Sequence, residues 1–285
     1  MRIVMDDAGD VPVHLIEELD IYVLPVNIMF GTEEYLSGVT MDHDAFYAKV
    51  ESVEEHNFPK TSQPTPYQFE QAFEEIIEDG ETEIVVIAVS ERLSGTYASA
   101  AAAARAVEGR ATVNLFDSKS GSAVQGLMVI EAARMARDGA SADAVCARLE
   151  KMRETFSVYF LIDSLEYAVK GGRVSSLRAG FANLLNIKPI MTLDDGLIVE
   201  AGKVRTYKKA VDWMVEAVRG DVGTTSVNLA VMHANNRAAG KALLENARPK
   251  LNVKEEFFMD MAVAVAINLG PGALGLVAIP ADGEP

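Results

Sequence analysis

The stretch Ile84-Val85-Val86-Ile87-Ala88-Val89, followed by Ser90 to Gly95 and an alanine-rich segment from Ala98 to Ala104, decides the fold class of this chain. The unbroken apolar run has the length of a buried strand, and alanine is the strongest helix former. The segment between them is short, so the strand leads into the helix through a tight turn. A strand followed directly by a helix is the repeating unit of α/β proteins.

The same alternation is expected on both sides of this unit. Before it, Thr65 is typical of an N-cap, Pro66 of a first helical residue and Gln68 of the partner in a capping box, so a helix is expected from Pro66 to about Asp79. After it we expect a strand from Thr112 to Phe116 and a helix from Ala123 to Arg137. Consecutive units of this kind predict a mostly parallel sheet, with ligands beyond the carboxyl ends of its strands.

The second half of the chain predicts a mixed α/β arrangement. We expect a strand from Phe156 to Ile162, a helix from Leu165 to Lys170 that ends at Gly171-Gly172, and a hairpin around Asp194-Asp195-Gly196. A chain of 285 residues can bury a large core and divide into domains. The predicted division is an α/β domain over residues 1–154 and a mixed α/β domain over residues 155–285.

Two hydroxyl-rich segments, Thr61-Ser62-Gln63-Pro64 and Ser94-Gly95-Thr96-Tyr97, precede expected helices. A helix start presents unpaired backbone N–H groups and the positive end of the helix dipole, so it stabilises a carboxylate or phosphate. Either segment alone is more simply explained as a helix cap. Facing one pocket, the two would form an anion site, whose ligand their spacing leaves open.

Composition excludes several classes of function. The net charge of −16 argues against nucleic acid and against anionic membrane surfaces. The longest apolar runs, such as Met261 to Ile267, are too short to span a membrane, and the first residues do not form a signal peptide, so a cytoplasmic protein is expected. The histidines are scattered and none is tied to Ser94 by a known pattern, so neither a metal site nor a serine hydrolase is expected.

The two hydroxyl-rich segments belong to an ordered series of motifs that resembles the DegV family of bacterial fatty-acid-binding proteins. The resemblance covers nearly the full length, including the opening Ile3-Val4-Met5-Asp6. The further motifs are Phe116-Asp117-Ser118, Gly171-Gly172-Arg173-Val174, Asn186-Ile187-Lys188-Pro189, Lys203-Val204-Arg205 and Gly270-Pro271-Gly272-Ala273.

This resemblance implies a two-domain protein that binds one long-chain fatty acid, with the carboxylate at the first domain and the acyl chain in the second. It also implies an acyl carrier without catalysis or cofactor, which presents the acid to a separate fatty acid kinase. A monomer is expected. The residues expected to hold the carboxylate are Thr61, Ser62, Ser94, Gly95 and Asn268, supported by Arg173 and Arg205; the expected acyl tunnel comprises Phe160, Ile162, Leu165, Phe181, Leu184 and Leu185.

The chain departs from the family pattern at two positions. Asn268 stands where family members usually have histidine, and Asp7 where they often have serine. Asparagine can donate a neutral hydrogen bond but cannot carry a proton charge, so the change bears most on a kinase-coupled role. The alternative is an enzyme that acts on a small carboxylated or phosphorylated metabolite in a cleft between the domains, with charged groups from Asp6, Asp117, Arg173 and Lys188.

Overall fold

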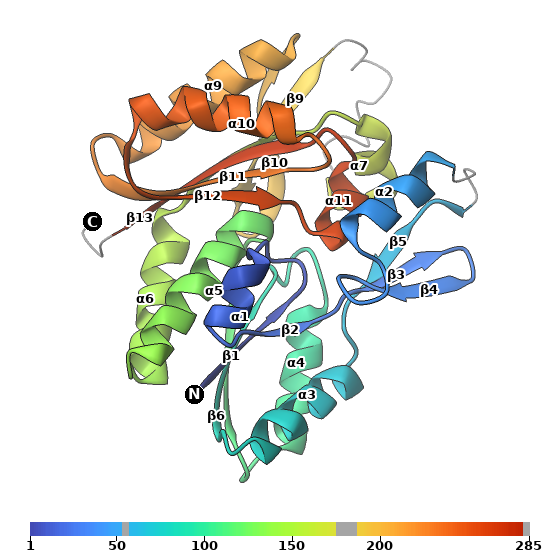
Figure 1. Ribbon diagram of the computed structural model, residues 1–285, viewed down its shortest axis with the longest axis vertical. Helices are drawn as coiled ribbons and strands as arrows, with labels where there is room; N and C mark the ends of the chain where they lie inside the picture. The colour runs from blue at the N-terminus through green and yellow to red at the C-terminus, as the bar shows by residue number, and fades with distance from the viewer. Residues whose placement is uncertain (53–56, 175–186, 282–285) are drawn as a thin grey trace.

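The first part of the chain builds a parallel sheet (Figure 1). The computed structural model describes residues 1–52, 57–174 and 187–281. The four-stranded sheet has the order β2 (Tyr22–Leu24), β1 (Arg2–Asp6), β6 (Glu83–Ala88) and β7 (Thr112–Asp117), and every neighbouring pair is parallel.

Helices cover both faces of this sheet, which explains its unbroken apolar strands. On β6, Val85 and Ile87 belong to one hydrophobic cluster, and Ile84 and Val86 belong to another on the opposite face. One face is covered by α3 (Pro66–Glu78) and α4 (Thr96–Ala106). The other face packs with α1 (Val13–Glu18), α5 (Ser122–Arg137) and α6 (Ala142–Thr155).

The second half of the chain builds a six-stranded mixed sheet. Its order is β10 (Leu197–Val204), β9 (Lys188–Asp194), β8 (Ser157–Leu161), β13 (Leu274–Pro280), β11 (Ser226–His233) and β12 (Asn252–Asp260). Only β11 and β12 are parallel among the described pairs. Its outer face carries α9 (Tyr207–Val222) and α10 (Arg237–Ala247), which is followed by a short 3-10 helix (Arg248–Lys250).

Helix α5 lies between the two large sheets (Figure 1). It contacts β1 and β6 on one side and β11 and β13 on the other. Its residues are buried without a break from Ser122 to Ile130. This part of the helix is covered by a sheet on each side, whereas Arg134 and Arg137 near its C-terminal end are partly exposed.

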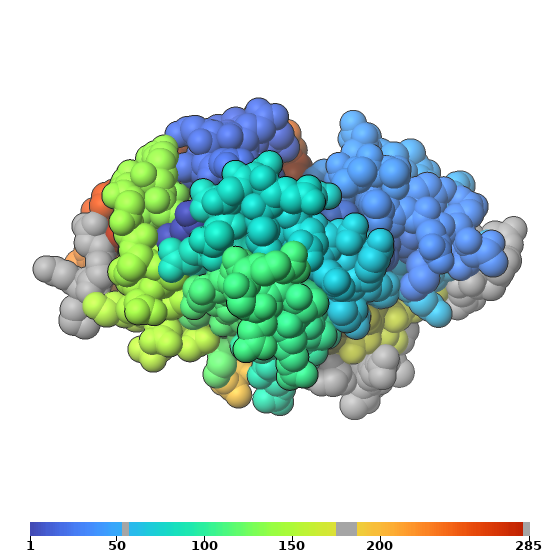
Figure 2. Space-filling model, turned by 90° about the horizontal axis from the view of Figure 1, so that it is seen from below, coloured from blue at the N-terminus to red at the C-terminus, as the bar shows by residue number. Residues whose placement is uncertain are grey.

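A smaller antiparallel sheet and two short helices complete the described fold. The sheet comprises β4 (Glu33–Leu36), β3 (Asn27–Phe30) and β5 (Lys60–Ser62), and α2 (His43–Glu51) follows β4. This part of the chain protrudes at one side of the molecule (Figure 2). The short helices α7 (Leu165–Gly171) and α11 (Val263–Leu269) contact each other.

The predicted fold class is confirmed. The first sheet is parallel and the second is mixed. The capping box at Thr65 and the hairpin at Asp195-Gly196 are present, the latter with positive φ angles of 43° and 79°. The division into residues 1–154 and 155–285 stays a prediction. Among the described residues, no helix is long and apolar enough to cross a membrane.

The close packing of α5 gives a stability prediction. A Cβ on Gly126 would lie 1.9 Å from the carbonyl oxygen of Asp10, so we expect Gly126→Ala to destabilise the protein. Overpacking of this kind costs about 1–3 kcal/mol and sometimes more. Gly220→Ala is the matched control, because a Cβ on this exposed glycine of α9 would meet no atom within 4 Å. It should raise the free energy of unfolding by about 0.5–1 kcal/mol. Urea unfolding measures the unfolding free energies of both variants. Equal values for Gly126→Ala and Gly220→Ala would contradict the packing described.

Candidate functional site

One cavity lies between the two large sheets, at the N-terminal end of α5. It has an empty volume of about 860 Å³, which includes open solvent at its mouth. Its walls come from the turn between β6 and α4, from β5, from the start of α5, from β8, from the β9–β10 hairpin and from α11. The site is therefore assembled from both halves of the chain.

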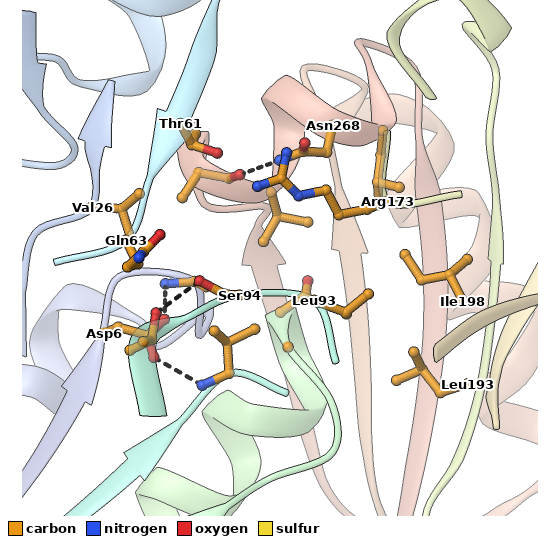
Figure 3. A pocket seen from close by; sticks show the side chains of 18 of the residues that line it. Asp6, Val26, Thr61, Gln63, Leu93, Ser94, Arg173, Leu193, Ile198 and Asn268 are labelled. Atoms are coloured by element: carbon orange, nitrogen blue, oxygen red, sulfur yellow. Dashed lines mark hydrogen bonds between the residues drawn. The ribbon is translucent and has the colours of Figure 1, made fainter. Parts of the chain in front are cut away.

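The polar end of the cavity carries hydroxyl groups from two segments (Figure 3). Thr61 and Ser62 lie on β5, and Ser94 and Thr96 lie at the start of α4. The hydroxyl oxygens of Ser94 and Thr96 are 2.9 Å apart. The structure thus brings the two hydroxyl-rich segments to one cavity.

The helix starts at this cavity differ from the prediction in one respect. Thr61 and Ser62 pair with β3, and α3 begins only at Pro66, where its N-terminus is satisfied by its own capping box. The helix starts that line the cavity belong instead to α4 and α5. Their N-caps, Gly95 and Gly121, have no side chain that could cap the first turn. The N–H of Ser122 in α5 donates to the carbonyl of Ala8 at 2.7 Å, so the anion-binding capacity of these helix starts comes mainly from the first turn of α4.

Arg173 supplies a positive charge beside these hydroxyls. Its Nη1 donates a 2.8 Å hydrogen bond to the carbonyl of Gly171, after which Gly172 ends α7 in the left-handed conformation with φ of 75°. Figure 3 shows the side chain extended toward Thr61 and Asn268. No carboxylate of the described residues forms an ion pair with Arg173. The guanidinium therefore keeps donors for an oxyanion.

Asn268 lies in the same wall, on α11. Its Nδ2 donates a 2.9 Å hydrogen bond to the carbonyl of Ala264, and its Oδ1 is buried without a partner among the described residues. A Cβ on Gly171 would lie 2.8 Å from that Oδ1, so the oxygen is turned toward α7. In this arrangement the Asn268 amide donates within α11, and its role as a donor to a carboxylate stays a prediction.

The other end of the cavity is apolar. Phe160 and Val158 contribute from β8, and Leu193 and Ile198 from the hairpin (Figure 3). Met232, Val265 and Leu269 extend this surface. Of the predicted tunnel residues, only Phe160 lines the cavity among those described. Ile162 and Leu165 belong to the hydrophobic core, and Phe181, Leu184 and Leu185 lie outside the described residues.

Two predicted head-group residues lie outside the lining. Arg205 is exposed between β10 and α9 and does not reach the cavity. Gly95 lies behind Gln63, whose Nε2 would be 2.8 Å from a Cβ at this position. Gln63 itself lines the cavity, although no role was predicted for it. The hairpin residues Leu193 and Ile198 were also missed, because a predicted hairpin does not reveal what its two faces contact.

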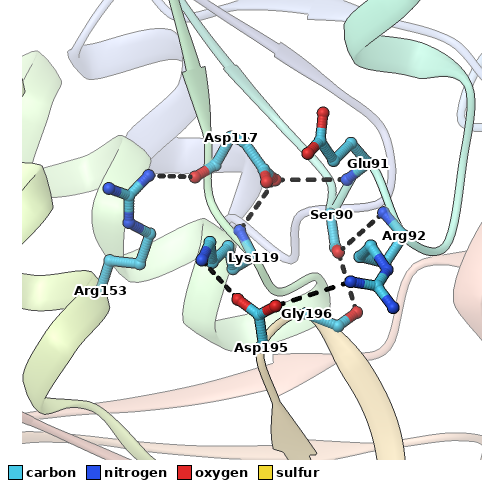
Figure 4. Close-up of polar contacts among 8 residues, drawn as sticks. All are labelled: Ser90, Glu91, Arg92, Asp117, Lys119, Arg153, Asp195 and Gly196. Atoms are coloured by element: carbon cyan, nitrogen blue, oxygen red, sulfur yellow. Dashed lines mark hydrogen bonds and ion pairs between the residues drawn. The ribbon is translucent and has the colours of Figure 1, made fainter.

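The tip of the hairpin is anchored to the first sheet (Figure 4). The Ser90 hydroxyl donates a 2.8 Å hydrogen bond to the carbonyl of Gly196. Asp195 forms ion pairs with Lys119 and, at 3.5 Å, with Arg92. Ser90 follows β6 and Lys119 follows β7, so the turns of the parallel sheet hold the hairpin that carries the apolar wall.

Asp6 fixes the floor of the cavity. Its carboxylate accepts hydrogen bonds from the backbone N–H of Val89 at 2.8 Å and of Ala8 at 3.1 Å, and from Gln125 Nε2 at 3.3 Å. Burial raises the pKa of Asp6 to about 6, although these hydrogen bonds favour its ionised form. Since Asp6 ends β1 and Val89 follows β6, the carboxylate ties two neighbouring strand ends together.

Asp10 holds α11 against α5. Its carboxylate accepts a hydrogen bond from the Ser122 hydroxyl and another, at 2.8 Å, from the N–H of Ala262, which is the N-cap of α11. Asp7 and Asp260 add unfavourable charge nearby, but burial is the main reason why the pKa of Asp10 rises to about 7. Asn268 is placed through this contact because it lies on the same short helix.

This pKa gives a pH-dependent prediction for stability. In the unfolded chain an aspartate titrates near its ordinary pKa of about 3.9, so between about pH 4 and pH 7 the folded protein binds more protons at Asp10. Its contribution to stability therefore falls as pH rises through this window. Asp10→Asn keeps an acceptor for Ala262 and removes the titration.

As pH rises within that window, we expect the unfolding free energy of the variant minus that of the wild type to increase by up to about 1.4 kcal/mol per pH unit. Urea unfolding of both proteins from pH 4.5 to 8 measures this difference. The contributions of the other carboxylates are nearly the same in both proteins and therefore largely cancel. Parallel curves would show that Asp10 titrates normally in the folded state.

Comparison with known proteins identifies the family. Residues 1–281 match the family described as "Uncharacterised protein, DegV family". The chain is 33% identical to a DegV domain-containing protein of Listeria monocytogenes over 280 residues, which is 97% of each chain. It is 32% identical to Protein DegV of Bacillus subtilis, covering 97% of this chain and 98% of that one. This protein belongs to the DegV family.

Solved structures of the family share its fold. A DegV family protein from Thermus thermophilus, whose structure concerns fatty acid binding, has a TM-score of 0.90 and 31% identity, covering 98% of this chain and all of that one. DegV of Bacillus subtilis, described as a fatty acid binding protein, has a TM-score of 0.84 and 29% identity over 98% of both chains. A stearic acid-binding protein from Eubacterium ventriosum has a TM-score of 0.88 and 25% identity, again over 98% of both.

Proposed function

We propose that this protein binds one long-chain fatty acid in the cavity between the two sheets. The observation that carries the proposal is the polarity of that cavity, which has hydroxyls and the Arg173 guanidinium at one end and an aliphatic wall at the other. The carboxylate would accept hydrogen bonds from Thr61 and Ser94, with Ser62 close by, and the acyl chain would run along Phe160 and the hairpin. Fatty acid binding by the structurally similar relatives supports this assignment.

The two ends of the cavity contribute differently to binding. Each buried methylene contributes about 0.8 kcal/mol, so a chain of about sixteen carbons can contribute on the order of 10 kcal/mol before the costs of ordering it. A carboxylate that is buried without partners would oppose binding. The apolar wall thus provides affinity, and the polar end sets the direction in which the acid lies.

We further propose that the protein is a cytoplasmic acyl carrier, a monomer without a cofactor, that presents the acid to a separate fatty acid kinase. Among the described residues, the charged side chains of the lining are Asp6 and Arg173, and the Asp6 carboxylate already accepts hydrogen bonds from two backbone N–H groups and the Gln125 amide. No histidine or lysine of the described residues lines the cavity. A carrier needs only such a passive binding surface.

The alternative of a metabolite enzyme has less support. Of its four candidate charged groups, only Asp6 and Arg173 line the cavity. Lys188 forms an ion pair with Asp163, and Asp117 accepts backbone N–H groups of Glu91 and Lys119. A small polar metabolite would leave the surface of Phe160, Leu193 and Ile198 uncovered.

Direct lipid analysis tests the central proposal. The protein would be purified from a bacterial host without added lipid and extracted with organic solvent, and bound acids quantified by mass spectrometry. About one long-chain acid per chain is the expected result. A protein that is empty, and that also takes up no added acid of any chain length, would refute fatty acid binding.

Substitutions at the polar end test the placement of the carboxylate. Ser94→Ala removes one hydroxyl donor, and we expect roughly three- to tenfold weaker binding of palmitate, the value of one hydrogen bond. Arg173→Ala should weaken binding more, because it removes a charged partner. Ser99→Ala, one turn further along α4 and outside the lining, is the control. Calorimetry on delipidated protein measures the palmitate affinity of all three variants. Unchanged affinity in both Ser94→Ala and Arg173→Ala would place the carboxylate elsewhere.

A substitution on the hairpin tests the position of the acyl chain. Ile198→Phe enlarges a side chain in the apolar wall, so we expect weaker binding of an eighteen-carbon acid with little change for a twelve-carbon acid. The loss corresponds to about 0.8 kcal/mol, or roughly fourfold, for each methylene displaced. Leu197→Phe is the matched control, because the side chain of Leu197, next to Ile198 in the chain, is 36% exposed and lies outside the lining. The same loss for both acid lengths would show that the chain does not extend to Ile198.

A further inference from the structure

A second cavity lies on the other side of the loop that follows β1. Its empty volume is about 1040 Å³ counted to its mouth. The direction of the side chains alternates along this loop, so that Asp6 and Ala8 line the first cavity and Asp7 and Gly9 line the second. The two cavities share no lining residue among those described. The second cavity is therefore separate from the proposed fatty acid site.

Carboxylates dominate the charge of this second cavity. Asp7, Asp10 and Asp42 line it, and the described residues contribute no lysine or arginine to its lining. Asp260 also lines it, but that carboxylate has Arg237 at 3.8 Å and the His233 ring at 3.4 Å. Within the described part of the chain, the other three carboxylates form no such ion pair.

Burial makes the negative charge of Asp7 unfavourable, whereas Asp42 and Asp260 are exposed. It raises the pKa of Asp7 to about 6, with Asp6 adding repulsion and Ser37 and His43 opposing the rise. A buried carboxylate without a cation costs stability unless a ligand neutralises it.

The walls and rim of the cavity are apolar. Val11, Ile16, Val23 and Pro25 form walls, and the rim carries Val13 and Val39, which are 70% and 68% exposed. These are two of the few large hydrophobic side chains exposed in the described part of the chain. Exposed apolar groups beside a cavity are typical of binding sites.

One buried polar group also faces this space. Ser37 is only 2% exposed and lines the cavity, yet its hydroxyl has no hydrogen-bond partner within the described residues. It lies near enough to Asp7 to favour the ionised carboxylate, without hydrogen-bond geometry. A buried hydroxyl is normally satisfied, so this one has capacity for a ligand.

We propose that the second cavity is a binding site for an organic cation, in which an ammonium or guanidinium group is attached to a short aliphatic body. The cationic group would donate charge-assisted hydrogen bonds to Asp7 and Asp42, and the aliphatic body would cover Val13 and Val39. The cation is either a free amine or guanidine, or the lysine or arginine side chain of a partner protein. This inference is independent of the proposed fatty acid function.

The same features argue against a metal ion at this place. No group of three or more His, Cys, Asp or Glu side chains in the described residues is arranged to hold one. A small hydrated ion would also leave the valine rim exposed to water. An organic cation satisfies both the carboxylates and the apolar surface.

Calorimetry on the full chain at pH 8 tests the proposal with three probes. These are hexylguanidine, the neutral hexanol, and a capped Val-Arg-Val peptide. We expect hexylguanidine or the peptide to bind at one site per chain, and hexanol to bind at least about tenfold more weakly, because it cannot form charge-assisted hydrogen bonds. Binding of the free guanidine indicates a small ligand; binding of the peptide alone indicates a partner protein.

Substitutions locate the site. Asp7→Asn and Asp42→Asn should each weaken binding about tenfold. In the wild type the Asp42 carboxylate caps α2 by accepting a 2.8 Å hydrogen bond from the N–H of Ala45. Asp42→Asn keeps this cap, because asparagine is also a good N-cap residue. Asp44→Asn, on the same helix and outside the lining, should bind like the wild type. Circular dichroism checks the folding of each variant. The proposal is overturned if neither cationic probe binds, or if both site variants bind as tightly as Asp44→Asn.

Discussion

The burial of α5 between two sheets is the constraint on which the rest of this structure depends. The first nine residues of the helix are buried without a break, and its close approach to the β1 loop requires glycine at position 126. The helix thereby fixes how the parallel and mixed sheets are placed relative to each other. The candidate fatty acid cavity lies where α5 begins, and Gly121 and Ser122 form part of its lining.

The candidate site depends on contacts that cross between the two sheets. The hydroxyl end belongs to the first half of the chain, whereas the apolar wall belongs to the hairpin of the second half. The hairpin is held by Ser90 and by the ion pairs of Asp195, all at the carboxyl ends of parallel strands. Ligands of open α/β sheets are expected at this edge, because loops from neighbouring strands meet there.

The aspartates at and after the end of β1 have different roles, although they lie close together in the sequence. Asp6 ties β1 to β6, and Asp10 holds the start of α11, so both are used by the fold. Asp7, between them in sequence, faces the second cavity. Alternation of side chains along one short loop thus gives adjacent aspartates different roles. In a protein with a net charge of −16, each buried carboxylate needs hydrogen-bond donors or a cation to offset its burial.

The sequence by itself determined the elements whose signals are local. The capping box at Thr65, the apolar run of β6 and the turn at Asp195-Gly196 all act through neighbours in the chain, and all were predictable. It also determined the family and the hydroxyl segments of the cavity. Only the tertiary structure decided that α5 rather than α3 presents the second helix start, that Leu193 and Ile198 form the apolar wall, and that Arg205 lies outside it. These outcomes depend on packing between residues far apart in the chain, which local propensity and spacing do not encode.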